Sequence, residues 1–216
     1  MGHASAASFN TGSDNIKREG NKATSKDGSR GYAMWSESFS SGKGTWKFKI
    51  DKDNVNDQRI CLGFGIKPVT DVNYDKSPQF WTYRGYNGKL YPKGNCQNAP
   101  IYDKFCTGDE IRFNLDHDAH TVSMEHNGVN KGVIFKDVPS KPIFPLIAFY
   151  GASVSASLVE ISGDTEAIGE ENFQHISSGV IKLDGDMMVK SSNTYKNHAV
   201  VGDIIPFSSN IQETFI

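Results

Sequence analysis

The chain has 216 residues, of which 37% are hydrophobic and 22% are charged, a composition typical of a globular protein rather than a disordered one. Because 23 Lys and Arg residues face 25 Asp and Glu residues, the net charge of −2 leaves no basic excess for binding nucleic acid. No apolar run reaches the ~18 residues of a membrane-spanning helix, and three cysteines without a CxxC motif favour an intracellular, reducing location in the cytoplasm or nucleus.

Apolar and polar residues alternate through the middle of the chain, which predicts β-strands. The clearest case is segment 46–50, where Trp46, Phe48 and Ile50 alternate with charged residues. Turn signals such as Asn127-Gly128 separate successive segments, and no helical period lies between them. The pattern indicates an all-β, two-sheet antiparallel sandwich. In chain order, the expected strands are 32–36, 46–50, 60–66, 80–83, 111–115, 122–125, 132–135, 144–150 and 154–161.

Both ends of the chain differ from the middle. Residues 1–13 begin with small and polar side chains and are expected to form a flexible lead-in, with the sandwich over 14–163. Residues 164–216 are interpreted as a linker followed by extra strands. Within them, Ile181-Lys182 and its surroundings loosely match Ile16-Lys17. Two interpretations stay open: the start of a second repeat of the same domain, or additional strands on the same sandwich.

Glycine-rich and aromatic segments follow one another in a definite order through the chain. They include Ser41–Phe48, Leu62–Gly65, Tyr83–Tyr91, Gly108–Ile111 with Leu115-Asp116, and Asn127-Gly128, followed by Gly132, Phe135, Pro145 and Val159. In this order and spacing, over residues 14–162, they resemble the SPRY domain family. The resemblance implies a concanavalin-like jelly roll and a role in protein–protein recognition, as an adaptor or targeting domain. Such domains are often found in ubiquitin ligases, histone-modifying complexes or large signalling proteins.

Two local segments resemble the SPRY proteins that carry a SOCS box. These are Asp27–Gly31 and Leu90-Tyr91. In that subgroup, the corresponding Arg and Tyr help to bind a short extended peptide with an acidic and Asn-rich motif. The resemblance implies that Arg30 donates to a carboxylate or carbonyl and that Tyr91 supplies a flat apolar wall. Tyr150-Gly151 replaces a Val-Trp pair of the subgroup, which changes the pocket.

The run from Phe80 to Tyr86 is dense in aromatic residues. Because a strand buries alternate side chains, some of these residues must face outward, and we expect Trp81 in the core with Arg84 and Tyr86 more exposed. The simpler alternatives are that Arg30 is a solvated turn residue and Tyr91 an ordinary aromatic at a strand end. The predicted peptide-binding residues are therefore Arg30, Arg84, Tyr86, Tyr91, Tyr150 and Gly151, and the expected ligand is a protein segment with acidic or amide side chains.

Catalytic and metal-binding patterns are not evident in the sequence. No GxSxG, HExxH or P-loop motif occurs. Glu125 stands alone on its strand, and Glu160 is the only carboxylate within its expected strand, 154–161, so no expected strand offers a glycosidase pair. His117 and His120 flank an expected hairpin tip, where solvated polar side chains are the norm, so neither a metal nor another cofactor is expected. Two other functions stay open: a lectin-like carbohydrate-binding module, and an enzyme on the same sandwich.

Overall fold

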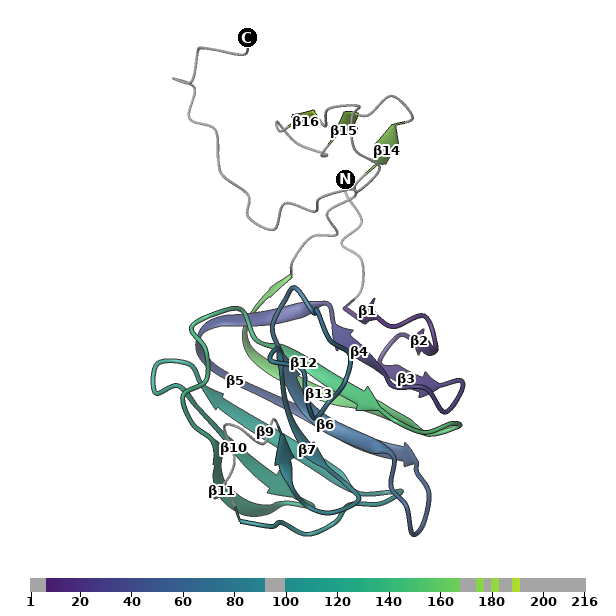
Figure 1. Cartoon of the computed structure of the whole chain (residues 1–216). Helices are drawn as coiled ribbons and strands as arrows, with labels where there is room; N and C mark the ends of the chain where they lie inside the picture. Colours follow the sequence, from purple (N-terminus) through teal and green to yellow (C-terminus); the bar gives the residue numbers. More distant parts are fainter. Residues whose placement is uncertain (1–6, 92–99, 168–173, 177–179, 183–187, 191–216) are drawn as a thin grey trace. The chain divides into compact units, whose positions relative to one another are not determined.

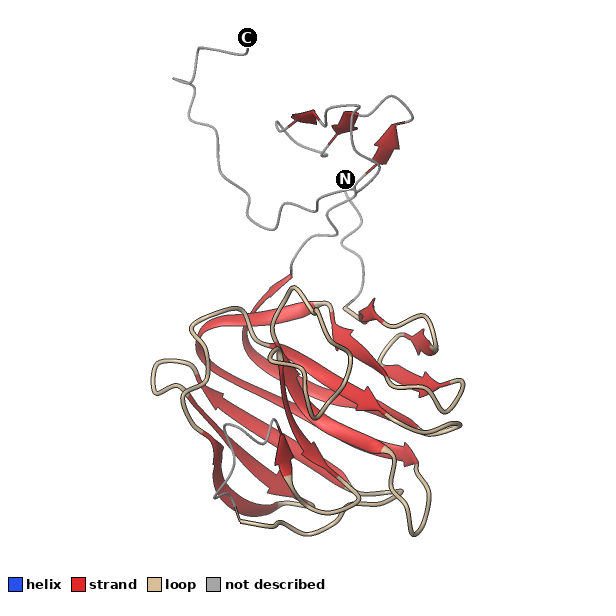
Figure 2. Ribbon diagram, viewed as in Figure 1, coloured by secondary structure: helices blue, strands red, loops and turns tan. Residues whose placement is uncertain are grey.

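The alternating segments form two antiparallel sheets (Figure 1). The computed structural model describes residues 7–91 and 100–167, together with the short segments 174–176, 180–182 and 188–190. The chain divides into two units, Met1–Ala167 and Ile168–Ile216. The first unit contains both sheets, and no helix occurs among the residues described (Figure 2). The expected all-β sandwich is therefore confirmed.

The first sheet has six strands, which lie in the order β1-β4-β12-β6-β7-β8. The strands β6 and β12 at its centre are buried along their whole length, so both faces of this sheet are covered. The strands of this sheet are β1 (Phe9–Gly12), β4 (Gly31–Trp35), β6 (Ile60–Gly65), β7 (Phe80–Arg84), β8 (Leu90–Tyr91) and β12 (Phe144–Phe149).

The second sheet has seven strands, in the order β11-β10-β9-β5-β13-β3-β2. Its strands β9 and β10 show the alternation expected of a sheet with one buried face and one solvated face. Asn127 and Gly128, which connect β10 to β11, both have positive φ, as a tight hairpin turn requires. The strands are β2 (Ile16–Glu19), β3 (Lys22–Ser25), β5 (Glu37–Lys52), β9 (Glu110–Asp116), β10 (Thr121–His126), β11 (Val129–Phe135) and β13 (Ser155–Ala167).

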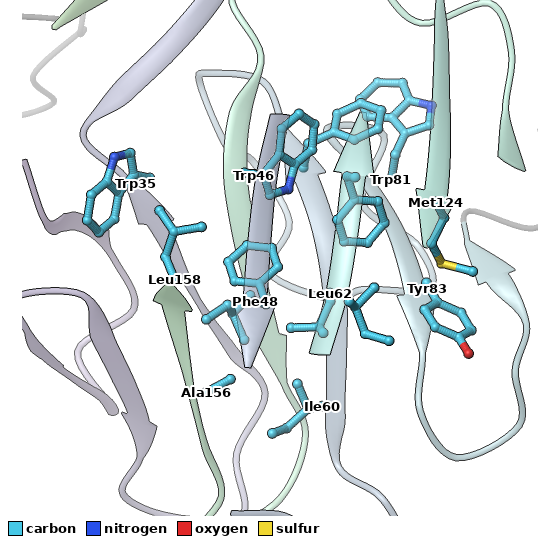
Figure 3. Close-up of a cluster of buried hydrophobic side chains, with 14 of the residues drawn as sticks. Trp35, Trp46, Phe48, Ile60, Leu62, Trp81, Tyr83, Met124, Ala156 and Leu158 are labelled. Atoms are coloured by element: carbon cyan, nitrogen blue, oxygen red, sulfur yellow. The ribbon is translucent and has the colours of Figure 1, made fainter. Parts of the chain in front are cut away.

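The main core lies between the two sheets and is rich in aromatic rings (Figure 3). Trp46 is fully buried, and its ring stacks at 5.6 Å from the rings of both Phe39 and Phe113. Trp81 stacks on Phe64 at 5.3 Å, so Trp81 lies in the core as expected. The apolar face of the segment 46–50 therefore forms the centre of the sandwich.

A second hydrophobic cluster covers the opposite face of the six-stranded sheet. The connection between β6 and β7, residues 66–79, places Val69 and Tyr74 against side chains of that sheet. The sheet side chains include Cys61, Phe144 and Leu146. This connection covers the outer face of the sheet, and Tyr74 within it belongs to the same cluster as Tyr91 and Tyr150.

The ends of the sandwich differ from the sequence-based boundaries. Strand β1 lies within the expected lead-in: it pairs with β4, and Phe9 is buried against Trp35 at 5.2 Å. Strands β2 and β3 were not expected either. Strand β13 continues to Ala167, beyond the expected end at 163, because Thr165 still pairs with Phe39 of β5.

The second unit contains a small antiparallel sheet. Its strands are β14 (Gln174–Ile176), β15 (Val180–Lys182) and β16 (Met188–Lys190). Ile181-Lys182 lies in β15, but most of its surroundings lie outside the described residues, so a second repeat stays a hypothesis.

Candidate functional site

Arg84 is the centre of a cluster of cations and tyrosines at the end of β7. Its Nε donates a hydrogen bond to the hydroxyl of Tyr150 at 2.9 Å. Its guanidinium carbon lies 4.6 Å from the ring centroid of Tyr150 and 5.1 Å from those of Tyr74 and Tyr86. Burial alone would lower the pKa of Arg84, but hydrogen bonds to Tyr150 and Tyr91 raise it above its ordinary value. The half-buried guanidinium is therefore a fixed positive charge.

Tyr74 joins the two predicted arginines, although the sequence analysis did not identify it. It is 5% exposed, and its ring lies 4.9 Å from that of Tyr150 and 5.2 Å from that of Tyr91. Arg30 lies over the same ring at 5.6 Å. Burial raises the pKa of Tyr74 to about 12, so the hydroxyl is neutral at physiological pH. The signal that could have found this residue is a single aromatic in an otherwise polar loop.

Arg30 is the most exposed arginine of the cluster. Its Nη1 lies 3.2 Å from a carboxylate oxygen of Asp75 and also donates to the side-chain oxygen of Asn73. Both partners belong to the β6–β7 connection. Arg30 is thus paired with side chains of its own chain and is not a freely solvated turn residue.

Tyr150 and Gly151 pack against the turn formed by residues 53–59. The Tyr150 hydroxyl donates to the Gln58 carbonyl, and Arg59 lies over the Tyr150 ring at 5.6 Å. A Cβ on Gly151 would lie 2.4 Å from Cγ of Arg59, so a larger side chain there requires Arg59 to move. The glycine therefore permits the close approach of Arg59.

Asp53 holds this turn in place. One of its carboxylate oxygens accepts hydrogen bonds from the backbone N–H groups of Asn54 and Arg59, both at 2.8 Å. Burial is the largest influence on this carboxyl and raises its pKa to about 6. The position of Arg59 beside Tyr150 depends on this buried acid.

The two remaining tyrosines differ in accessibility. Tyr86 is 39% exposed and lies between two cations, with Arg84 at 5.1 Å and Lys104 Nζ at 5.2 Å from its ring centroid. Tyr91 is only 3% exposed, and its hydroxyl accepts a hydrogen bond from Asn87. Tyr91 therefore supports the cluster from beneath and is not the open wall that the resemblance implied.

The structure brings all the predicted site residues together, although they are up to 121 positions apart (30 to 151). Arg30, Arg84, Tyr86 and Lys104 provide the accessible part, while Tyr74, Tyr91 and Tyr150 lie beneath them. Cations held beside aromatic faces suit carboxylate, amide and carbonyl groups. The arrangement contains no nucleophile–base pair and is suited to binding.

Neither the histidines nor the glutamates considered from the sequence form a second site. His117 is buried at the hairpin rather than solvated, and its Nε2 lies 3.3 Å from the Lys141 carbonyl oxygen. Among the described residues, no group of three potential metal ligands gathers. Glu125 of β10 and Glu160 of β13 lie on strands that are not neighbours, and Arg112 of β9 pairs with both, at 3.6 Å and 2.8 Å.

The two antiparallel sheets define the class of the protein as an all-β sandwich, and comparison with known proteins identifies its family. The SPRY domain family matches residues 43–160, more than half of the chain. This chain therefore belongs to the SPRY domain family, a family of protein-interaction modules. In the described part of the chain, no helix is long and apolar enough to cross a membrane.

Solved structures agree with this assignment. The SPRY domain of human HERC1 aligns with a TM-score of 0.63 at 30% identity, covering 71% of this chain and 93% of that one. Another human SPRY domain aligns with a TM-score of 0.53 at 17% identity, covering 69% of this chain and 96% of that one, which supports the fold alone.

Curated relatives share a shorter stretch. The F-box/SPRY domain-containing protein 1 of Anopheles gambiae is 39% identical over 70 residues, which is 32% of this chain and 25% of the relative. The protein of the same name from Drosophila mojavensis is 31% identical over 85 residues, covering 38% of this chain and 34% of the relative. The chain thus spans a quarter to about a third of these relatives.

Proposed function

We propose that the Arg84 cluster binds a short extended segment of a protein partner that carries acidic or amide side chains. The observation that carries this proposal is the placement of Arg84 within 5.1 Å of three tyrosine rings while it stays partly exposed. Aromatic side chains and arginine are the residue types that dominate binding energy in interfaces. Because packing already fixes the guanidinium, little conformational entropy is lost when a ligand binds.

Cations and rings alternate in a row, in which the three cations and Tyr86 are accessible and Tyr74 is buried. From Arg30 the row passes over Tyr74 to Arg84, and then over Tyr86 to Lys104, with successive separations between 5.1 and 5.6 Å. These separations limit the row to a length of about six residues of extended chain at most. A segment of this length can place more than one acidic or amide side chain against the cations.

The wider role that we propose is that of an adaptor, which recruits a partner protein to a larger assembly inside the cell. Support comes from the curated relatives, whose names combine an F-box with a SPRY domain. In this proposal the chain supplies partner recognition for a ubiquitin ligase or a related scaffold. Any ligase activity would belong to other polypeptide segments or to other subunits.

The proposal is tested by affinity capture from cell extract with quantitative mass spectrometry. The parent chain is compared with Arg84→Ala and Tyr86→Ala, and Lys17→Ala serves as a control that removes a cation from β2 of the other sheet. We expect the same partners to be depleted by both cluster variants and retained by the control. Capture that is equal in all four samples would refute the proposed site.

Peptide and glycan arrays, probed with the same proteins, separate the proposal from the lectin-like alternative. Among the aromatic residues that the structure describes, Tyr86 is the one with an exposed ring, whereas sugar-binding surfaces rely on several. We therefore expect peptide binding without glycan binding, and a glycan signal that disappears in Tyr86→Ala would favour the lectin.

A further inference from the structure

One cation of the proposed binding row, Arg30, is already bound by side chains of the same chain. The side-chain oxygen of Asn73 and a carboxylate oxygen of Asp75 both accept from Nη1 of Arg30. An amide and an acid are the two groups that the proposed partner segment would offer. The connection between β6 and β7 therefore presents, at Arg30, the chemistry of the expected ligand.

The backbone of this connection is fixed independently of Arg30. The Asn73 carbonyl accepts hydrogen bonds from the N–H groups of Lys76 at 3.0 Å and Ser77 at 2.8 Å, and the Asn73 N–H donates to Asp71 at 2.8 Å. Tyr74, between the two Arg30 partners, is buried under the row. The side chains of Asn73 and Asp75 can therefore rotate away from Arg30 while the connection stays in place.

We propose that Asn73 and Asp75 form an internal competitor for Arg30, and that a partner segment must displace their side chains. The inference rests on the proposed function, because it concerns the same row of cations. It also specifies the chemistry of the ligand, because Asn73 and Asp75 both reach the one guanidinium from a turn. The preferred partner segment therefore offers an amide and a carboxylate that can reach Arg30 together.

The internal contact is weak enough to be displaced. The side chains of Arg30 and Asp75 are 44% and 31% exposed, so water and salt screen their attraction. Exposed ion pairs and hydrogen bonds of this kind change an equilibrium by a small factor, and removing both partners should tighten ligand binding about three- to tenfold. A competitor of this strength would lower the affinity of every ligand for Arg30 by a small factor. A segment that makes further contacts with the row would still bind.

The first test uses a synthetic peptide that copies residues 71–76 (DVNYDK), acetylated, amidated and labelled with a fluorophore. Its affinity is measured by fluorescence anisotropy for the full chain and for the double variant Asn73→Ala/Asp75→Ala. We expect the double variant to bind about three- to tenfold more tightly, and a further Arg30→Ala change to remove the gain. A peptide with alanine in place of its own Asn and second Asp is the matched control and should bind weakly to every form.

Three results would overturn the inference: equal affinity for the parent and the double variant, a gain that survives Arg30→Ala, or no binding to either form. The same assay with Arg84→Ala in the double variant separates this inference from the proposed function. If Arg84→Ala weakens binding while the loop changes have no effect, the cluster binds peptide but the internal competitor is refuted. If Arg84→Ala has no effect, the proposed function itself fails.

A second test needs no ligand. Phenylglyoxal modifies accessible guanidinium groups, and mass spectrometry of peptides reports the rate at each arginine. We expect Arg30 to react about three- to tenfold faster in Asn73→Ala/Asp75→Ala than in the parent chain, with Arg18 as the internal reference. An unchanged rate at Arg30, in a variant with the parent melting temperature, would show that the loop side chains do not occupy the guanidinium.

Discussion

Replacement of Tyr74 separates the contribution of its ring from that of its bulk. Its ring contacts two other tyrosine rings, at 4.9 and 5.2 Å, and two guanidinium groups, at 5.1 and 5.6 Å. Each ring pair contributes about 0.5–1.5 kcal/mol beyond its buried area, and each partly exposed cation–π contact contributes about 0.5–1 kcal/mol. The four contacts together amount to about 2–5 kcal/mol. Because leucine keeps most of the buried volume and part of the packing, Tyr74→Leu should destabilise the fold by roughly 2–3 kcal/mol, in the lower part of that range.

Two further substitutions at the same position complete the series. Tyr74→Phe keeps the ring and should change the free energy of unfolding by less than about 0.5 kcal/mol. Tyr74→Ala also removes the buried volume and should cost about 3–5 kcal/mol. Chemical denaturation followed by circular dichroism measures all three, with partner binding as a second readout. A Leu variant that is as stable as the Phe variant would refute the assigned role of the ring contacts.

Three other predictions concern stability. Trp46→Ala should cost about 3–5 kcal/mol because the side chain is fully buried between the sheets. Lys47→Ala on the opposite face should cost only about 0.5–1 kcal/mol, since its ion pairs with Glu110 and Glu160 are partly solvated. If Trp46→Ala and Lys47→Ala lost equal stability in chemical denaturation, the assignment of the buried and exposed faces of β5 would be wrong. The raised pKa of Asp53 gives a stabilising contribution that is present below about pH 4 and lost as the pH rises through about 6. Asp53→Asn should therefore flatten the dependence of unfolding free energy on pH in this window, by roughly 3 kcal/mol, and an unchanged slope would contradict the pKa. Truncation after Ala167 should leave a cooperative melt and a β-type spectrum, and an insoluble product would show that the first unit needs the second.

The long central strands could be predicted from the sequence because each buries one face in the main core. Trp46 and Phe48 in β5, and Ile111 and Phe113 in β9, repeat with a period of two, which local sequence displays directly. The short strands β1, β2 and β3 were not predicted because four residues are too few to show a period. Phe9 in β1 reveals its role only through Trp35, 26 positions away in the chain.

The site was predictable only in part, for a related reason. Arg30 and Tyr91 were found through resemblance, and Arg84 and Tyr86 through the aromatic run around them. The burial of Tyr91 and Tyr150 depends on the β6–β7 connection, which covers the outer face of the sheet and has no periodic pattern. Arg59 and Lys104 carry no local sequence signal, and Tyr74 shows only that it is the single aromatic of its loop, since each joins the cluster through contacts between segments distant in the chain.

The central claim is that the row around Arg84 is the surface that binds a partner segment. Calorimetric titration of the captured partner segment against the parent chain, Arg84→Lys, Tyr86→Ala and Lys17→Ala tests it most directly. Losses of about 1–3 kcal/mol in binding free energy are predicted for the first two variants, because lysine lacks the planar fork and alanine lacks the ring. The binding free energy of the control Lys17→Ala should equal that of the parent. The melting temperatures of Tyr86→Ala and Lys17→Ala should also stay close to that of the parent. Parent-like binding by both Arg84→Lys and Tyr86→Ala would contradict the account and place the binding surface elsewhere on the sandwich.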